Sequence, residues 1–99
     1  IQLEALRKDY LSATEDFDAV LIPTSPILPP KVADLAADEA FFVAENLMAL
    51  RNTRIGNLMG LCALTLPTGV PSCGLMAMGR PNEEEALLSV GLALEHALA

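Results

Sequence analysis

Apolar side chains recur at helical spacing in the first part of the chain. Leu3, Leu6 and Tyr10 fall on one stripe, and charged residues occupy most of the remaining surface. This spacing predicts an amphipathic helix over residues 1–14. A second helix is predicted over residues 38–50, which are rich in Ala, Glu, Leu and Met. Its apolar residues spread around most of the helix surface, so we expect it to be covered on more than one side.

A third helix is predicted at the C-terminal end of the chain. Asn82 is a suitable N-cap residue, and the acidic residues that follow it suit the positive end of the helix dipole. The residues expected on the buried face of this helix are Leu87, Leu88, Gly91, Leu94 and Leu98.

Three short apolar runs predict strands at residues 17–22, 63–67 and 75–78. In the first, consecutive apolar residues run up to Pro23, which is typical of a strand buried on both faces, as in parallel sheets. The predicted order is therefore helix, strand, helix, strand, strand, helix, and the fold class is α/β. Because two or three helices barely cover both faces of three strands, we expect the strands to belong to a larger sheet.

Two stretches between these elements are candidates for a binding site. Residues 23–30 contain four prolines and leave the end of the first predicted strand, where ligands gather in open α/β sheets. Residues 51–54, Arg-Asn-Thr-Arg, lie between a predicted helix and a glycine-containing passage over 55–60 that predicts turns. Guanidinium, amide and hydroxyl groups recognise carboxylates and amides, but arginine is also favoured at a polar helix C-terminus. Both interpretations stay open on the residues alone.

The composition excludes several classes of protein. With 99 residues, 53% hydrophobic and 19% charged, the chain is one small domain rather than a disordered segment. A net charge of −7 repels phosphate backbones, so nucleic acid is not an expected partner, and no apolar run is long enough to span a membrane. Two cysteines and no secretory leader predict a cytoplasmic location. The chain begins without Met and already in helical phase, so we expect it to be a piece of a longer protein.

The remaining polar residues form no complete catalytic or metal-binding set. His96 is the one histidine and has no second imidazole with which to share a metal. Cys62 lies beside an apolar strand and is expected to pack in the core. Three prolines separate Ser25 from Lys31, and nothing predicts that this lysine lies beside the serine hydroxyl as a base must. We therefore predict no catalytic residue, no cofactor and no metal in this chain.

Four segments together resemble the late part of amidase signature enzymes. Residues 57–69, NLMGLCALTLPTG, resemble the pattern N-L-x-G-x-P-A-x-S-x-P-x-G of that family. Residues 17–26 resemble its D-x-L-L-x-P-T-x-P strand, residues 74–81 its G-L-Q-L-I-G-R-P segment, and residues 84–88 its D-E-x-x-L-L helix start. The matches cover nearly the whole chain in the order of the family. The chain departs from the family at Cys62, where most members have Pro, and in a shorter link after Pro67.

The resemblance implies a parent enzyme that hydrolyses carbon–nitrogen amide bonds with a serine, a second serine on a cis peptide and a lysine, all upstream of this chain. Residues 1–99 would be the C-terminal segment of that amidase domain, the C-terminal portion of a large mixed β-sheet flanked by helices. Family members choose substrates with positions that match Arg51, Asn52 and Thr53, which we predict to bind substrate. The implied partners are the remainder of the parent amidase chain and a small-molecule amide substrate.

Two alternatives stay open. The chain could be a stand-alone, non-catalytic α/β interaction or oligomerisation module that forms a homo-oligomer through exposed strand edges. It could also be an independent small-molecule binding domain in which Arg51 and Arg54 hold an anion.

Overall fold

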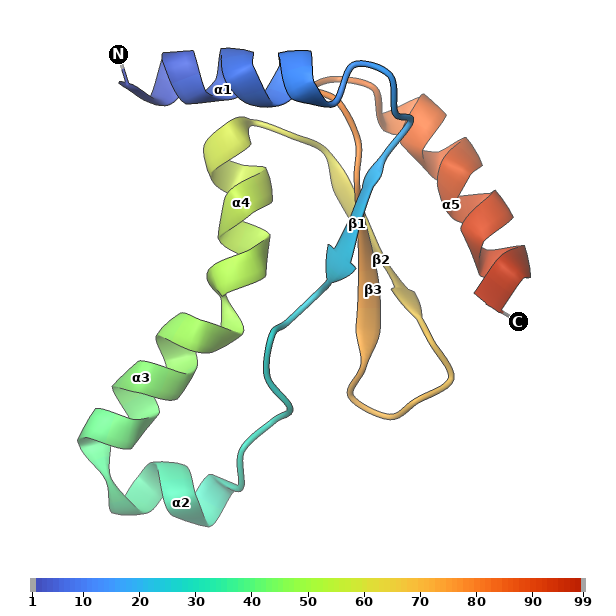
Figure 1. Cartoon of the computed structure of the whole chain (residues 1–99). Coiled ribbons are helices and arrows are strands. Elements are labelled where there is room, and N and C mark those ends of the chain that lie inside the picture. The colour runs from blue at the N-terminus through green and yellow to red at the C-terminus, as the bar shows by residue number, and fades with distance from the viewer. Residues whose placement is uncertain (1, 99) are drawn as a thin grey trace.

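The computed structural model describes residues 2–98 and contains five helices and three strands over that range. Figure 1 shows the elements in chain order. They are α1 (Gln2–Ala13), β1 (Val20–Pro23), α2 (Val32–Ala37), α3 (Glu39–Ala49), α4 (Arg51–Met59), β2 (Ala63–Pro67), β3 (Gly74–Met78) and α5 (Glu84–Leu98).

The three strands form one antiparallel sheet with β3 in the centre, in the order β1-β3-β2. Ala77 of β3 pairs with Leu21 of β1 on one side and with Leu64 of β2 on the other. The core lies on this central strand, because Met76, Ala77 and Met78 are all buried. The predicted strand positions are confirmed, but the parallel-sheet interpretation is wrong. A run of apolar residues reports burial, and it does not distinguish the direction of the neighbouring strand.

The two faces of the sheet are covered unequally. α5 packs on β2 and β3, where its buried residues Leu87 and Gly91 meet the face that carries Ala77 and Leu64. The opposite face approaches α4, since Gly56 lies near the Met78 sulfur. No helix of residues 2–98 packs extensively on β1, whose residues alternate between half-buried and exposed. The prediction of strands buried on both faces is therefore wrong for β1 and β2, which have one covered face at most.

The helices α2, α3 and α4 form an arm, of which α4 lies beside the sheet and α3 and α2 extend away from it, and α1 crosses the end of α4 (Figure 1). Arg7 Nε donates to the Leu58 carbonyl at 2.7 Å, and an Arg80 guanidinium nitrogen donates to the Leu11 carbonyl at 3.2 Å. These long-range bonds join α1 to α4 and to the segment after β3. The chain measures 46 × 41 × 17 Å, so it is a plate rather than a sphere.

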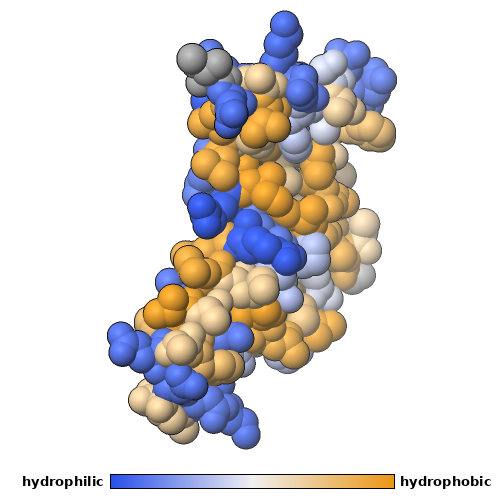
Figure 2. All heavy atoms as spheres, turned by 60° about the vertical axis from the view of Figure 1, so that its left-hand side comes forward, coloured by the Kyte–Doolittle hydropathy of each residue, from blue (hydrophilic) through white to orange (hydrophobic). Residues whose placement is uncertain are grey.

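The flat shape leaves a large apolar surface exposed. The accessible area is 7067 Å², whereas a compact protein of this mass exposes about 5,400 Å². Figure 2 shows apolar atoms spread over much of one face, interrupted by a hydrophilic patch. α3 has no buried residue, so the prediction that this helix is covered on more than one side is wrong. Among the described residues, the helices that contact α3 most are α2 and α4.

Two stretches of the middle of the chain differ from the sequence prediction. Residues 51–59 form α4, although Gly56 and Gly60 predicted turns from 55 onward. Gly60 does end the helix, with a φ of 70°, whereas Gly56 is accommodated inside it at a cost of about 1 kcal/mol relative to Ala. α2 was not predicted, because its six residues follow two prolines and have no side-chain N-cap bond.

The start and face of α5 also require correction. Asn82 has a φ of 61° and lies in a turn before Glu83, so it is not the N-cap of a helix that begins at Glu84. Leu88 is 64% exposed, because the sheet covers only the strip of α5 around Leu87 and Gly91.

Candidate functional site

The two stretches that the sequence proposed as binding regions meet in the structure. Asn52, in the first turn of α4, donates from Nδ2 to the carbonyl of Pro23 at 2.8 Å. Pro23 is the last residue of β1 and the first of the proline-rich loop. This bond joins residues 29 positions apart and places the 51–54 turn beside the exit of the strand.

The three predicted site residues have different environments. Asn52 is buried, and it is the one buried polar side chain among residues 2–98. Arg51 is exposed, and its Nε lies 3.4 Å from Asn52 Oδ1. Thr53 is half-buried, and its hydroxyl donates to the Leu50 carbonyl of the preceding turn at 3.1 Å. Of the three, Arg51 is the side chain that presents a charged group to the surface.

A hollow of about 330 Å³ is lined in part by Ala49, the last residue of α3, which precedes this turn in the chain. Its lining consists of Ser25, Ile27, Pro29, Ala49 and Ser72. Three segments therefore contribute to it, namely the loop after β1, the end of α3 and the hairpin between β2 and β3. Sequence reasoning identified the loop but missed Ser72, which has a φ of 64° and comes from a hairpin far along the chain. No signal in the sequence connects that hairpin to residues 23–30.

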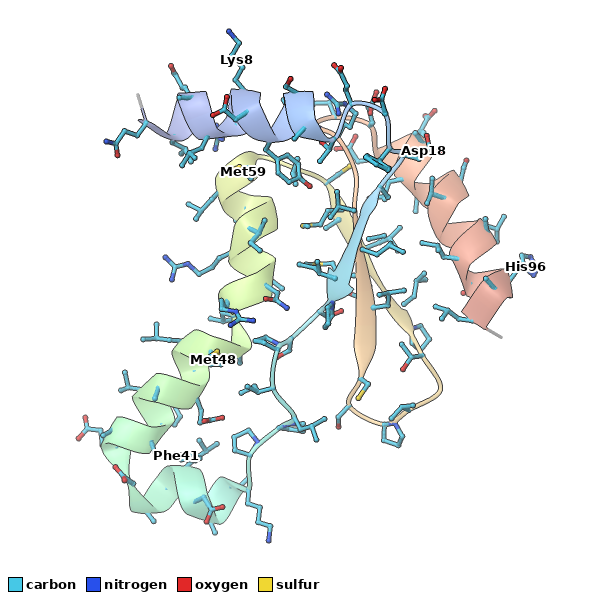
Figure 3. All side chains as sticks on the ribbon, in the orientation of Figure 1. Lys8, Asp18, Phe41, Met48, Met59 and His96 are labelled. Carbon is cyan, nitrogen blue, oxygen red and sulfur yellow. The ribbon has the colours of Figure 1, made fainter. Side chains whose placement is uncertain are left out.

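The other candidate residues lie apart from this hollow. His96 is on the outer side of α5 in its last turn (Figure 3). Cys62 is half-buried rather than in the core, and its Sγ donates to the Arg80 carbonyl at 3.1 Å, while Cys73 is exposed. Lys31 precedes α2 without a capping side-chain bond. Among residues 2–98, no group of three or more His, Cys, Asp and Glu side chains is placed to hold a metal ion.

Tyr10, in α1, is half-buried and lies near Arg80. Partial burial raises its pKa above 10.0, and the nearby Arg80 guanidinium acts in the opposite direction because it favours the tyrosinate. Tyr10 belongs to α1, which crosses the Met59 end of α4 rather than the Arg51 end (Figure 3). The raised pKa of Tyr10 is therefore a consequence of how α1 packs and not a feature of the 51–54 turn.

Comparison with known proteins identifies relatives of this chain. The chain is 42% identical over 85 residues to 2-amino-5-chloromuconic acid deaminase of Comamonas testosteroni, a match to 82% of this chain and 18% of the deaminase. It is 32% identical to the A subunit of the glutamyl-tRNA(Gln) amidotransferase of Sulfurisphaera tokodaii over 99% of this chain and 21% of that relative. The corresponding protein of Archaeoglobus fulgidus is 34% identical over 85% of this chain and 18% of its own length. Over most of its length the chain is homologous to members of the amidase signature family.

The chain spans about a fifth of the length of the curated relatives that it matches. No family model matches it, and neither does any solved structure. The α/β class and the resemblance to amidase signature enzymes are confirmed by these homologues and by the fold. Within residues 2–98 no helix has both the length and the apolar character needed to cross a bilayer.

Proposed function

We propose that residues 1–99 form the C-terminal segment of an amidase signature domain that hydrolyses carbon–nitrogen amide bonds. The observation that carries the proposal is the extent of the matches, which cover 82–99% of this chain but only 18–21% of each enzyme. A segment of that kind needs the rest of its enzyme as a partner. The excess exposed surface on α3 and on β1 is consistent with such a partner, because a monomer rarely leaves so much apolar area in water.

In this proposal the chemistry belongs to the upstream part of the parent chain. The serine nucleophile, the second serine on a cis peptide and the lysine lie there, and this chain has no catalytic residue of its own. Its strands complete the large mixed sheet, and its 51–53 turn forms part of the wall of the substrate pocket. The turn of Arg51, Asn52 and Thr53 would then face a small-molecule amide substrate, with the exposed Arg51 side chain in direct contact with it.

The exposed guanidinium of Arg51 favours a substrate that carries a carboxylate. A guanidinium binds a carboxylate through two parallel, charge-assisted hydrogen bonds, and it keeps its charge at every physiological pH. One relative is named for its action on an acid, 2-amino-5-chloromuconic acid. We therefore expect the parent enzyme to prefer acidic amides over neutral ones of the same size.

The first experiment is to determine the coding sequence immediately upstream of Ile1 in the source DNA. We expect an in-frame extension that encodes a lysine and a Gly-Ser-rich loop. The polypeptide encoded by that extension, co-expressed with this chain, should hydrolyse amides. The purified 99-residue chain alone should not hydrolyse amides above the uncatalysed rate. Amide hydrolysis by the isolated chain, or a start codon close to Ile1 without such an extension, would overturn the proposal.

A stand-alone oligomerisation module is the second candidate function. The observation that favours it is that β1 and β2 are both edge strands, with no strand of residues 2–98 beyond either. Multi-angle light scattering of the purified chain tests it in the presence and absence of the upstream polypeptide. A discrete homodimer that persists when the upstream polypeptide is present would favour the module over the amidase segment.

A further inference from the structure

We propose that Asn52 is a positioning residue, which fixes the exit of β1 and the Arg51 side chain relative to each other rather than contacting a ligand. The inference rests on the proposed function for what the site binds. The hydrogen bonds through which Asn52 acts are a property of this chain alone, so they can be tested independently of any activity.

The direction of the Pro23 carbonyl explains why Asn52 is needed. Thr24 N–H donates to the Gly74 carbonyl, so the amide groups of Thr24 and Ile22 face β3. Adjacent residues of a strand alternate in direction, and Pro23 therefore turns its carbonyl toward the open edge of the sheet. No strand of the described residues lies there to donate to it. The Asn52 Nδ2 group takes the place of the missing strand at 2.8 Å.

Because Asn52 is buried, its bond to the Pro23 carbonyl helps to hold α4 against β1. Asn52 is 7% exposed, so water cannot easily replace the Pro23 carbonyl as its partner. A buried amide that loses its acceptor retains its full desolvation cost, which opposes any movement of α4 away from β1. α4 otherwise packs mainly against α1 and α3, and the arm of helices thus depends on Asn52 for its hydrogen-bonded attachment to the sheet.

The other end of the same side chain faces Arg51. Asn52 Oδ1 lies 3.4 Å from Arg51 Nε, a long contact that restricts the direction of the guanidinium without occupying its terminal nitrogens. Those terminal nitrogens remain available for a carboxylate. One buried amide therefore sets both the position of the loop that lines the hollow and the direction of the Arg51 guanidinium.

The primary test is an NMR measurement on the 99-residue chain without substitution. The Nδ2 protons of Asn52 should exchange with solvent at least about tenfold more slowly than those of Asn46, which is exposed on α3. A through-bond coupling between Asn52 Nδ2 and the Pro23 carbonyl carbon should also be detectable. Equal exchange rates for the two side-chain amides would overturn the proposal.

The second test uses Asn52→Asp, which keeps the shape and removes the donor, with Asn46→Asp as the matched control. The substitution at 52 should shift the Pro23 carbonyl and Arg51 Nε resonances, and the control should shift neither. In the enzyme reassembled with the upstream polypeptide, Asn52→Asp should raise KM for an acidic amide several-fold more than it lowers kcat. Unchanged Pro23 and Arg51 resonances would contradict the positioning role. Shifted resonances in a chain that supports no hydrolysis would instead count against the proposed function alone.

Discussion

Gly91 on α5 lies so close to Leu64 on β2 that a Cβ atom at position 91 would stand 2.8 Å from Leu64 Cδ2. The helix and the sheet therefore approach each other closely at a residue without a side chain. Glycine inside a helix costs about 1 kcal/mol relative to alanine, and the close packing of α5 on the sheet compensates for that cost.

Replacing Gly91 by Val should separate α5 from β2 and lower the free energy of unfolding by about 1–3 kcal/mol, because the branched side chain overpacks the contact with Leu64. Urea unfolding followed by circular dichroism measures the change. Ala93→Val, at an exposed position of the same helix, is the control and should cost less than about 1 kcal/mol. Unchanged or higher stability of Gly91→Val would show that helix propensity, and not packing on the sheet, governs position 91, because valine is a better helix former than glycine.

Substituting Arg7 by Ala should loosen α1 from the end of α4. Arg7 Nε donates to the Leu58 carbonyl at 2.7 Å, and its guanidinium also lies beside Gly60, where the negative end of the α4 dipole is located. The expected loss is about 1–2 kcal/mol of unfolding free energy, with faster proteolysis within α1. Lys8 points away from the molecule, so Lys8→Ala should leave both values unchanged (Figure 3). Intact protection of α1 in Arg7→Ala would contradict this role.

Asp38 should contribute its stability locally, at the start of α3. Its Oδ1 accepts from the Ala40 and Phe41 amides at 3.0 and 3.2 Å, which satisfies two donors that have no partner within the helix. Asp38→Ala should destabilise α3 by about 0.5–2 kcal/mol, measured as faster hydrogen exchange at these two amides. Asp38→Asn keeps an acceptor oxygen and should retain most of the protection. Faster exchange throughout the sheet in Asp38→Ala would show that the effect is not local.

Tyr10 should make the protein less stable at alkaline pH. Burial raises the pKa of Tyr10 above its ordinary value of 10.0, so the folded protein holds the phenolic proton more tightly than the unfolded chain does. The resulting contribution to stability is present below pH 10.0 and is lost as the pH rises through the folded-state pKa. Tyr10 is the one tyrosine and the chain has no tryptophan, so ultraviolet absorbance reports its titration directly.

Two variants separate the causes of that titration. Tyr10→Phe should remove this part of the alkaline pH dependence, since it deletes the ionising group. Arg80→Met should raise the pKa of Tyr10 further, because the guanidinium charge that favours the tyrosinate is lost. A lower pKa of Tyr10 in Arg80→Met would show that increased exposure of the ring outweighs the lost charge.

The sequence predicted the positions of the strands and of the long helices because those elements are governed by short-range patterns. Asp38 and the Ala-rich segment after it indicate α3, and the apolar run before Pro23 indicates β1. The burial of these elements was predicted poorly. Leu88 and α3 have the apolar character of covered surfaces, yet the described residues leave Leu88 exposed and bury no residue of α3. Apolar periodicity records what a surface is suited to contact, whether or not that contact lies in the same 99 residues.

The candidate site was predicted in part for a related reason. The sequence identified the polar 51–54 turn and the proline-rich loop separately, but the bond between Asn52 and the Pro23 carbonyl depends on strand direction and register. Neither is encoded in a local pattern, since a carbonyl is present at every residue. The contribution of Ser72 to the hollow likewise depends on where the β2–β3 hairpin folds back.

Both outer strands of the sheet end in proline at the same end of the sheet. Pro23 of β1 pairs with Leu75, and Pro67 of β2 pairs with Gly74, its neighbour in β3. Thr24 N–H donates to the Gly74 carbonyl, and the Cys62 carbonyl accepts from Gly79 N–H, so the backbone groups of Thr24 and Cys62 face the central segment. Because direction alternates along a strand, the backbone groups of Pro23 and Pro67 face away from β3. Proline has no amide hydrogen, so each edge lacks an outward donor at this end.

The remaining outward amide donors lie toward the other end, at Leu21 on one edge and at Ala63 and Thr65 on the other. A strand that joins the sheet from any source is therefore held by main-chain bonds at one end and is free to diverge at the other. Because each edge lacks an outward donor at one end, a second copy of the chain can pair with only part of that edge. This limits open-ended stacking of the sheet into fibres.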